Sequence, residues 1–269
     1  MCGIIGYVGS TQLSIDSCLD ILKALEVEQL PIESSPIGGH GAGLMVYDGF
    51  RILMEKVGGK EASPVEDLRR IIYDSWKVNF SRVILGHVRR ASQVFTHTIP
   101  FKECTQPYIA ECLGEFKVVS VHNGFLKNYL DLKGKLKYKH KFESESVALI
   151  DSEVFPHLLE ELILDYGDSV ETAKMLFESI EGGNTVAMMV FADGILSLYI
   201  VHKGVTRGLA LWRNSLGHVL FGSRSYIVDK FARGFLRENG FNLDFIVKPR
   251  SEGNLVKYYR FSVDELFKS

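Results

Sequence analysis

The chain opens with the stretch MCGIIGYVGS, residues 1–10, in which residues 2–8 are small and mostly apolar. Such a run predicts a buried strand with Cys2 at its start. The segment that follows has apolar residues at helical spacing: Ile15, Cys18, Leu19, Leu22 and Leu25. This spacing predicts an amphipathic helix directly after the strand.

Two hairpins are predicted further along the chain, each around an Asp-Gly pair. The pairs are Asp48-Gly49 and Asp193-Gly194, and this dipeptide suits the positive φ angles of a tight turn. The flanking strands are expected at residues 44–47, 51–57, 185–191 and 195–201. Both elements are therefore expected to be antiparallel.

Helices and further strands complete the pattern. The helices are expected at residues 63–78, 151–166, 168–180 and 226–238, and two more strands at residues 82–88 and 116–122. Ser63 and Pro64 supply an N-cap and a favourable first helical residue, whereas Pro156 requires its helix to begin only a few residues earlier. Hairpins followed by helices, rather than strict strand-helix alternation, indicate an α+β fold in which helices cover antiparallel sheet.

The composition is that of a globular protein with balanced charge. Its 269 residues, 46% of them hydrophobic, can bury one core, so we expect a single domain over residues 1–269. The 31 basic and 33 acidic residues nearly cancel, which argues against nucleic acid or an anionic membrane as a partner. No apolar run approaches the roughly 18 residues of a membrane span, and the opening lacks the positive region of a secretory signal. We therefore expect a cytoplasmic protein.

Neither a disulfide framework nor a metal centre is expected. The four cysteines, Cys2, Cys18, Cys104 and Cys112, are scattered and form no C-x-x-C pair. No metal-ligand cluster stands out among the eight histidines. The prediction is reduced thiols, no metal and no cofactor.

Cys2 directly follows the initiator methionine, and its small side chain permits removal of Met1. Processing would leave a thiol and a free α-amine on one residue. Because an α-amine titrates at about 7.7–8.0 and a thiol at about 8.5, the amine can accept the thiol proton at neutral pH. Cys2 is therefore a candidate nucleophile, and the simpler alternative is a small apolar residue that begins a buried strand.

Three later segments carry the other groups that amide cleavage requires. Arg89, in GHVRRAS (residues 86–92), can bind a carboxylate bidentately at the end of a strand. Asn123 and Gly124, in VHNG, can aim a side-chain amide and a backbone N–H at an oxyanion. Asp151 can hold an α-ammonium group. Each has a plainer alternative, in order a surface salt bridge, a hairpin turn and a helix N-cap.

Together and in this order, these segments resemble the class II glutamine amidotransferases, whose glutaminase domains belong to the N-terminal-nucleophile superfamily. The matching segments are MCGIIGYVG, Ala42-Gly43-Leu44, GHVRRAS, Gln106-Pro107-Tyr108, VHNG and IDSEVFPHL. The resemblance implies a four-layer αββα sandwich of two antiparallel sheets flanked by helices. It also implies roles: nucleophile for Cys2, oxyanion hole for Asn123 and Gly124, and glutamine binding for Arg89, Ser92 and Asp151.

The chain departs from the family's pattern near the expected pocket. Arg90 and Ser92 stand where an aromatic residue and a threonine are usual, and residues 37–41 (IGGHG) replace an arginine-glycine-x-aspartate run. The interval between VHNG and the aspartate motif is slightly long, so Glu145 is a rival for the ammonium-binding role, although the motif fits better around Asp151. Neighbouring His122 is taken as structural, because the terminal amine supplies the base.

The resemblance implies hydrolysis of L-glutamine to L-glutamate and ammonia through a Cys2 thioester. Since no second, acceptor-binding domain is recognised, we expect an ammonia-accepting synthase subunit as partner, with a glutamate-synthase-like complex as first candidate. A homo-oligomer is compatible with the sequence. Two other interpretations stay open: a glutamine-binding regulatory subunit with little turnover, supported by Arg90 in the pocket wall, and another N-terminal-cysteine amidase.

Overall fold

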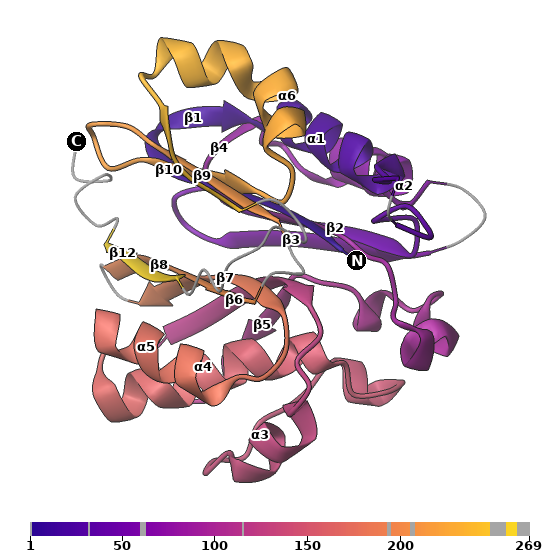
Figure 1. Cartoon of the computed structure of the whole chain (residues 1–269), viewed down its shortest axis with the longest axis vertical. Helices are drawn as coiled ribbons and strands as arrows, with labels where there is room; N and C mark the ends of the chain where they lie inside the picture. Colours follow the sequence, from indigo (N-terminus) through magenta and orange to yellow (C-terminus); the bar gives the residue numbers. More distant parts are fainter. Residues whose placement is uncertain are drawn as a thin grey trace.

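Two antiparallel sheets stack face to face, and helices cover the outer face of each sheet (Figure 1). This computed structural model describes residues 2–31, 33–59, 63–114, 116–192, 195–204, 208–247 and 257–262. The layers run in the order helices, sheet, sheet, helices. The predicted α+β fold with a four-layer αββα arrangement is therefore confirmed.

The first sheet has seven strands, each antiparallel to its neighbours. In order across the sheet they are β11 (Asn242–Val247), β9 (Leu209–Arg213), β10 (Val219–Gly222), β1 (Gly3–Ser14), β4 (Phe80–Val88), β2 (Gly41–Tyr47) and β3 (Ile52–Gly58). The second sheet has five antiparallel strands. Their order is β12 (Lys257–Ser262), β8 (Ile195–Lys203), β7 (Asn184–Ala192), β6 (Phe116–Gly124) and β5 (Tyr108–Ala110).

Within the described residues, α1 (Ile15–Val27), α2 (Pro64–Ser75) and α6 (Ser225–Glu238) lie on the first sheet (Figure 1). On the second sheet lie α4 (Val154–Tyr166) and α5 (Val170–Ser179). Helix α3 (Tyr129–Lys135) packs against α4, farther from the strands. Short 3₁₀ turns complete the described elements: η1 (Gln93–Thr98), η2 (Lys102–Cys104), η3 (Ser144–Ser146) and η4 (Asp151–Glu153).

The near-continuous apolar character of β1 follows from burial of both its faces. Ile4 and Val8 belong to the core between the sheets, whereas Ile5 and Tyr7 belong to the core beneath the helices. Successive strand residues point to opposite faces, so a strand covered on both sides needs apolar residues at nearly every position. On the helix side, Leu22 of α1 is fully buried, a burial that contributes about 1.5–3 kcal/mol.

Most predicted elements are confirmed, including both hairpins and the apolar face of α1. The turn expected at Asp193-Gly194 lies outside the described residues. The first strand is longer than predicted, because β1 continues past a register shift to Ser14. The helix expected at residues 63–78 ends earlier, at Ser75, because Trp76 is extended and packs into the core under the helices.

The sandwich brings three strand ends together. Gly3 pairs with Val88, so the start of β1 lies beside the end of β4 in the first sheet. The end of β6, in the second sheet, carries Asn123 and Gly124. The segments with candidate catalytic residues therefore approach one another from both sheets. Within the described residues, no helix combines the length and apolar character that a membrane crossing requires.

Candidate active site

Cys2 lies where the two sheets meet. Its backbone N–H donates to Asn123 Oδ1 at 3.2 Å, across 121 residues of sequence. Its Sγ lies 3.3 Å from the backbone nitrogen of Arg90, which donates to it, and 3.5 Å from the Arg90 carbonyl oxygen. The thiol is half-buried. Strand pairing therefore holds the sulfur against the loop after β4, whereas Met1 lies outside the described residues.

Asn123 is buried, and its side-chain contacts fix the orientation of its amide. Since Oδ1 accepts the Cys2 N–H, Nδ2 points the other way and lies 3.4 Å from Ser223 Oγ. That hydroxyl oxygen also accepts the N–H of Ile4 at 2.9 Å. An amide nitrogen carries two hydrogens, so Asn123 keeps one donor beyond the bond to Ser223. No local sequence signal indicates this role of Ser223, because its contacts form across about 100 residues or more.

Gly124 follows in a position where a side chain would not fit. A Cβ there would lie 2.4 Å from His122 Nε2 and 2.6 Å from the carbonyl oxygen of Gly183. The imidazole of His122 is itself held on both sides, by Ser152 Oγ at 2.8 Å and Asn184 Oδ1 at 3.0 Å. These contacts occupy both ring nitrogens, which suits a structural role for His122.

Gln106 holds the backbone just before Asn123. Its Nε2 donates to the carbonyl oxygen of His122 at 3.1 Å, and its Oε1 accepts the N–H of the same residue. The backbone of Gln106 in turn packs against β2: a Cβ on Gly43 would lie 2.1 Å from the Gln106 carbonyl oxygen. Gly43 in one sheet and His122 in the other are therefore linked through Gln106.

Arg89 is buried at the end of β4, with 4% of its surface exposed. Its guanidinium donates to the Thr98 carbonyl oxygen at 3.1 Å and to Thr98 Oγ1 at 2.5 Å. These bonds occupy two of the five N–H donors of the guanidinium. The buried position argues against the surface salt bridge that was the plainer alternative. Ser92, by contrast, is exposed just before η1.

Asp151 is buried at the start of η4, and its Oδ2 accepts the N–H of Leu126 at 2.9 Å. Burial raises the pKa of Asp151 to about 6, opposed by backbone hydrogen bonds from Leu126 and Ser152 and by the charge of Arg89. Its rival Glu145 is exposed and forms an ion pair with Lys133. Of the two carboxylates, Asp151 is therefore the one whose pKa responds to the charge of Arg89.

Two departures from the family pattern contact each other. Arg90 Nη1 lies 2.6 Å from His40 Nε2, and Arg90 Nε donates to the Pro36 carbonyl oxygen at 2.8 Å. Burial and the positive charges of Arg90 and Arg89 lower the pKa of His40 to about 4, so the imidazole is neutral at physiological pH. His40 Nδ1 accepts the N–H of Ala91 at 3.1 Å. The Arg90 side chain is thus anchored to the segment before β2.

The sequence indicated no metal-ligand cluster, but the fold brings together four side chains that could hold a metal ion. Cys112, His140, His157 and Glu160 each offer one ligand atom, and these four atoms lie within 4.8 Å of one another. The sequence concealed this cluster because its members come from the β5–β6 connection, the segment after α3, and α4.

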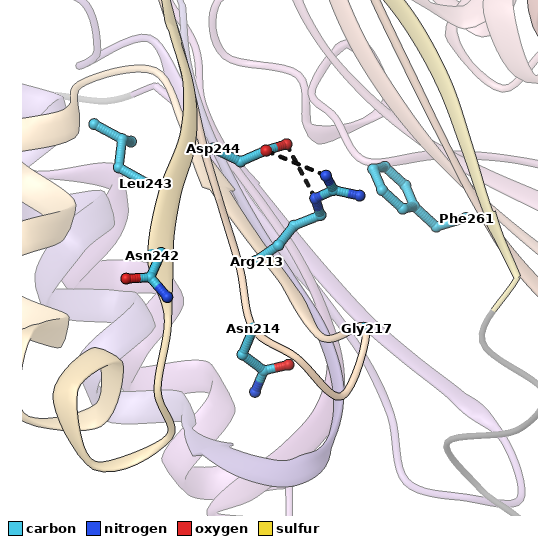
Figure 2. Close-up of a pocket in the computed structure, with 7 residues that line it drawn as sticks. All are labelled: Arg213, Asn214, Gly217, Asn242, Leu243, Asp244 and Phe261. Carbon is cyan, nitrogen blue, oxygen red and sulfur yellow. Dashed lines mark hydrogen bonds and ion pairs between the residues drawn. The ribbon is translucent and has the colours of Figure 1, made fainter.

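A surface pocket lies at the edge of the first sheet, as Figure 2 shows. It is lined by Arg213, Asn214, Gly217, Asn242, Leu243, Asp244 and Phe261. The Arg213 and Asp244 side chains pair in it, with Nε to Oδ2 at 3.0 Å and Nη2 to Oδ1 at 3.1 Å. None of the predicted catalytic or substrate-binding residues lines this pocket. The candidate active site is therefore at the strand ends around Cys2 and not in this pocket.

No family model matches the chain. Among curated proteins, the glutamine–fructose-6-phosphate aminotransferase (isomerizing) of Pyrococcus horikoshii is 30% identical over 260 residues, 92% of this chain and 38% of the relative. The enzyme of the same name from Helicobacter pylori is 32% identical over 190 residues, 70% of this chain and 27% of the relative. The chain therefore spans well under two thirds of these relatives.

Two solved structures match the fold. An allosteric regulatory enzyme of purine biosynthesis gives a TM-score of 0.64, with 19% identity over 97% of this chain and 49% of that one. The glutamine phosphoribosylpyrophosphate amidotransferase of Bacillus subtilis, in complex with ADP and GMP, gives 0.61 at the same identity and the same two coverages. These two structures show the shared fold, and the shared sequence with the first group shows that the chain belongs to the class II glutamine amidotransferases.

Proposed function

We propose that the chain hydrolyses L-glutamine to L-glutamate and ammonia, with Cys2 as nucleophile. The observation that carries this proposal is the contact between Cys2 and Asn123. It joins the candidate nucleophile, which directly precedes β1 of the first sheet, to a residue of β6 in the second sheet that offers an amide donor. If Cys2 were only a small apolar residue at the start of a buried strand, a contact with Asn123 would not be expected.

In the proposed first half-reaction, the α-amine left by Met1 removal accepts the thiol proton, and the Cys2 sulfur attacks the glutamine amide carbon. The oxygen of that amide becomes an oxyanion beside Asn123 Nδ2 and the N–H of Gly124. The C–N bond then breaks, the proton passes from the α-amine to the leaving nitrogen, and ammonia departs. The backbone N–H of Arg90, 3.3 Å from Sγ, favours the thiolate that forms on the way.

The second half-reaction returns the enzyme to its starting state. Water attacks the γ-glutamyl thioester while the α-amine takes one of its protons, and the same donors stabilise the second oxyanion. The C–S bond breaks, the thiolate regains the proton, and glutamate is released. No cofactor or metal takes part in this scheme.

Substrate recognition is proposed to rest on Arg89 and Asp151. Arg89 retains three N–H donors beyond its bonds to Thr98, enough for a bidentate contact with the glutamine α-carboxylate. Asp151 carries a buried carboxylate near that positive charge, which suits the α-ammonium group. Ser92 is exposed, and we propose for it only a place at the entrance of the site.

The ammonia acceptor is proposed to lie on another domain or subunit. The curated relatives carry the name of an aminotransferase that acts on fructose 6-phosphate, and this chain spans 38% and 27% of the two described. The part of those proteins that this chain does not match is long enough to contain a synthase unit. We therefore propose transfer of ammonia to a synthase partner, in the cytoplasm.

Glutamate release from L-glutamine tests the proposal, with mass spectrometry of the same sample to establish whether Met1 is absent. Cys2→Ser is expected to lower turnover by at least about 10³-fold, as loss of a catalytic nucleophile does. Cys18→Ala, which removes a buried thiol of α1, should leave turnover close to that of the parent. Equal turnover in the parent and the Cys2→Ser protein would refute the proposed nucleophile.

The same assay separates the regulatory interpretation. A glutamine sensor would bind glutamine, measured by calorimetry, but would release no ammonia with or without co-purified partners. That interpretation rests on Arg90 alone, whose side chain is held by Pro36 and His40.

A further inference from the structure

A second cluster of side chains lies outside the candidate active site, and two of its members are on α4, which covers the outer face of the second sheet (Figure 1). His157 and Glu160 are on α4, three residues apart, and therefore on one face of the helix. Cys112 comes from the β5–β6 connection, and His140 from the segment between α3 and η3. The proposed glutaminase reaction uses none of these residues.

Four separations between the ligand atoms are close to those of a tetrahedral metal site, and all four atoms lie within 4.8 Å of one another. His140 Nδ1 and His157 Nδ1 are 3.2 Å apart, and His140 Nδ1 and Glu160 Oε2 are 3.3 Å apart. Cys112 Sγ lies 3.8 Å from His157 Nδ1, which is 3.8 Å from Glu160 Oε2. Zinc bonds of about 2.0–2.3 Å in a tetrahedron imply ligand separations of about 3.3–3.6 Å.

The hydrogen bonds around Glu160 leave one carboxylate oxygen for the cluster. Oε1 accepts the N–H groups of Cys112 and Leu113 at 2.7 and 2.9 Å. Oε2 is buried and forms no hydrogen bond of good geometry among the described residues; it faces the Nδ1 atoms of His140 and His157 at 3.3 and 3.8 Å, and the Glu160 side chain is fully buried. Burial of a carboxylate oxygen without a hydrogen-bond donor costs folding free energy unless a cation lies next to it.

The hydrogen bonds around His140 likewise orient its ring. Its Nε2 donates to Glu161 Oε1 at 2.9 Å, so the lone pair is on Nδ1, which faces the cluster. The Glu161 carboxylate is itself held by the N–H groups of Lys137 and Tyr138, at 3.0 and 2.9 Å. A carboxylate behind a metal-binding histidine is a recurrent feature of zinc sites.

We propose that Cys112, His140, His157 and Glu160 bind one Zn²⁺ ion. A thiolate, two imidazoles and one carboxylate form a donor set typical of zinc rather than of magnesium or calcium, which prefer oxygen ligands. Four protein ligands close the site, so the ion has a structural role. It ties the β5–β6 connection and the segment after α3 to α4, three segments that meet on the outer face of the second sheet.

The metal content of the full chain, purified without chelator and dialysed against metal-free buffer, tests this proposal. We expect about one zinc per chain by elemental analysis, and a loss of at least about tenfold in Cys112→Ser and Glu160→Gln. His97→Gln and Cys2→Ser are matched controls, because they remove an exposed histidine and the other half-buried thiol outside the cluster. Both should keep the zinc of the parent.

Cobalt binding to the parent protein provides a second measurement, which does not depend on how the variants fold. Co²⁺ added to chelator-treated parent protein should give the sulfur-to-cobalt charge-transfer band and the intense visible bands of a tetrahedral thiolate site. Glu161→Gln should retain these bands but bind zinc about 10–100-fold more weakly. Folded parent protein without zinc and without the cobalt bands would overturn the proposal, and a proton shared between His140 and His157 would then explain the contact.

Discussion

Exchange of Asn123 for aspartate tests the proposed oxyanion donor with little change of shape. The amide oxygen of Asn123 accepts the N–H of Cys2, and its nitrogen faces Ser223 with one hydrogen to spare. Aspartate keeps an oxygen for Cys2 but replaces the donating nitrogen by a second acceptor. The substitution therefore removes the donor and retains the contact with the nucleophile.

The expected loss follows from the magnitude of one such donor. Removal of a single oxyanion-hole donor costs about 2.7–4 kcal/mol, or about 10²–10³ in kcat. The negative charge that Asn123→Asp adds next to the developing oxyanion acts in the same direction, so the upper part of this range is expected. The KM for glutamine should change little, because the oxyanion forms only after binding.

Initial rates of glutamate formation over a range of glutamine concentrations separate kcat from KM. Asn184→Asp is a matched control, since Asn184 is also a buried asparagine of the second sheet but contacts His122 rather than Cys2. Thermal unfolding confirms that both variants are folded. A folded Asn123→Asp protein with kcat within about threefold of the parent would refute the reasoning.

Three other predictions concern substrate binding and the link between the sheets. Because burial raises the pKa of Asp151 to about 6, its carboxylate loses its charge as the pH falls through that value, and the KM for glutamine should then rise about tenfold per pH unit; a flat profile of KM between pH 5 and 7 would contradict this. The same raised pKa means that the contribution of Asp151 to stability is greatest at low pH and is lost as the pH rises through about 6. Arg89→Lys removes the bidentate geometry and the paired bonds to Thr98. The KM for glutamine should therefore rise by about tenfold to a hundredfold, while kcat changes less. Steady-state kinetics with an unchanged KM would exclude Arg89 as the ligand of the substrate carboxylate. In Gly43→Ala the new Cβ would lie 2.1 Å from the carbonyl oxygen of Gln106. Denaturant unfolding should therefore show a free energy of unfolding lower by about 1–3 kcal/mol. A free energy of unfolding equal to that of the parent would show that the contact is relaxed at no cost.

The sequence predicted the elements of the fold well, because the relevant signals are local. The apolar spacing of α1 and the Asp48-Gly49 turn each lie within a short window, and both are found as expected. The end of α2 was missed because Trp76 leaves the helix to pack into the core. Only tertiary structure decides between helix and extended backbone at such a position.

The candidate site was less accessible to sequence reasoning. The order of the motifs indicated Cys2 and Asn123, but periodicity alone does not reveal that they touch. The choice between Asp151 and Glu145 depends on burial, which neither local sequence determines. The convergence of Cys112, His140 and Glu160 was not visible in the sequence, because 28 and 20 residues separate them, far from the short spacings by which metal motifs are recognised.

Gln106 connects Gly43 of the first sheet to His122 of the second, and so helps to fix the spacing between the two sheets. The sulfur is carried by one sheet and the amide that would polarise the substrate by the other, so the thickness of the sandwich sets the distance between reactants. Ile4 and Met189 are among the apolar side chains that fill the space between the sheets. Their volume therefore helps to set the distance between Cys2 and Asn123, although neither contacts the substrate in the proposed reaction. A change in their volume is therefore expected to lower the rate of the reaction, in addition to its cost in stability.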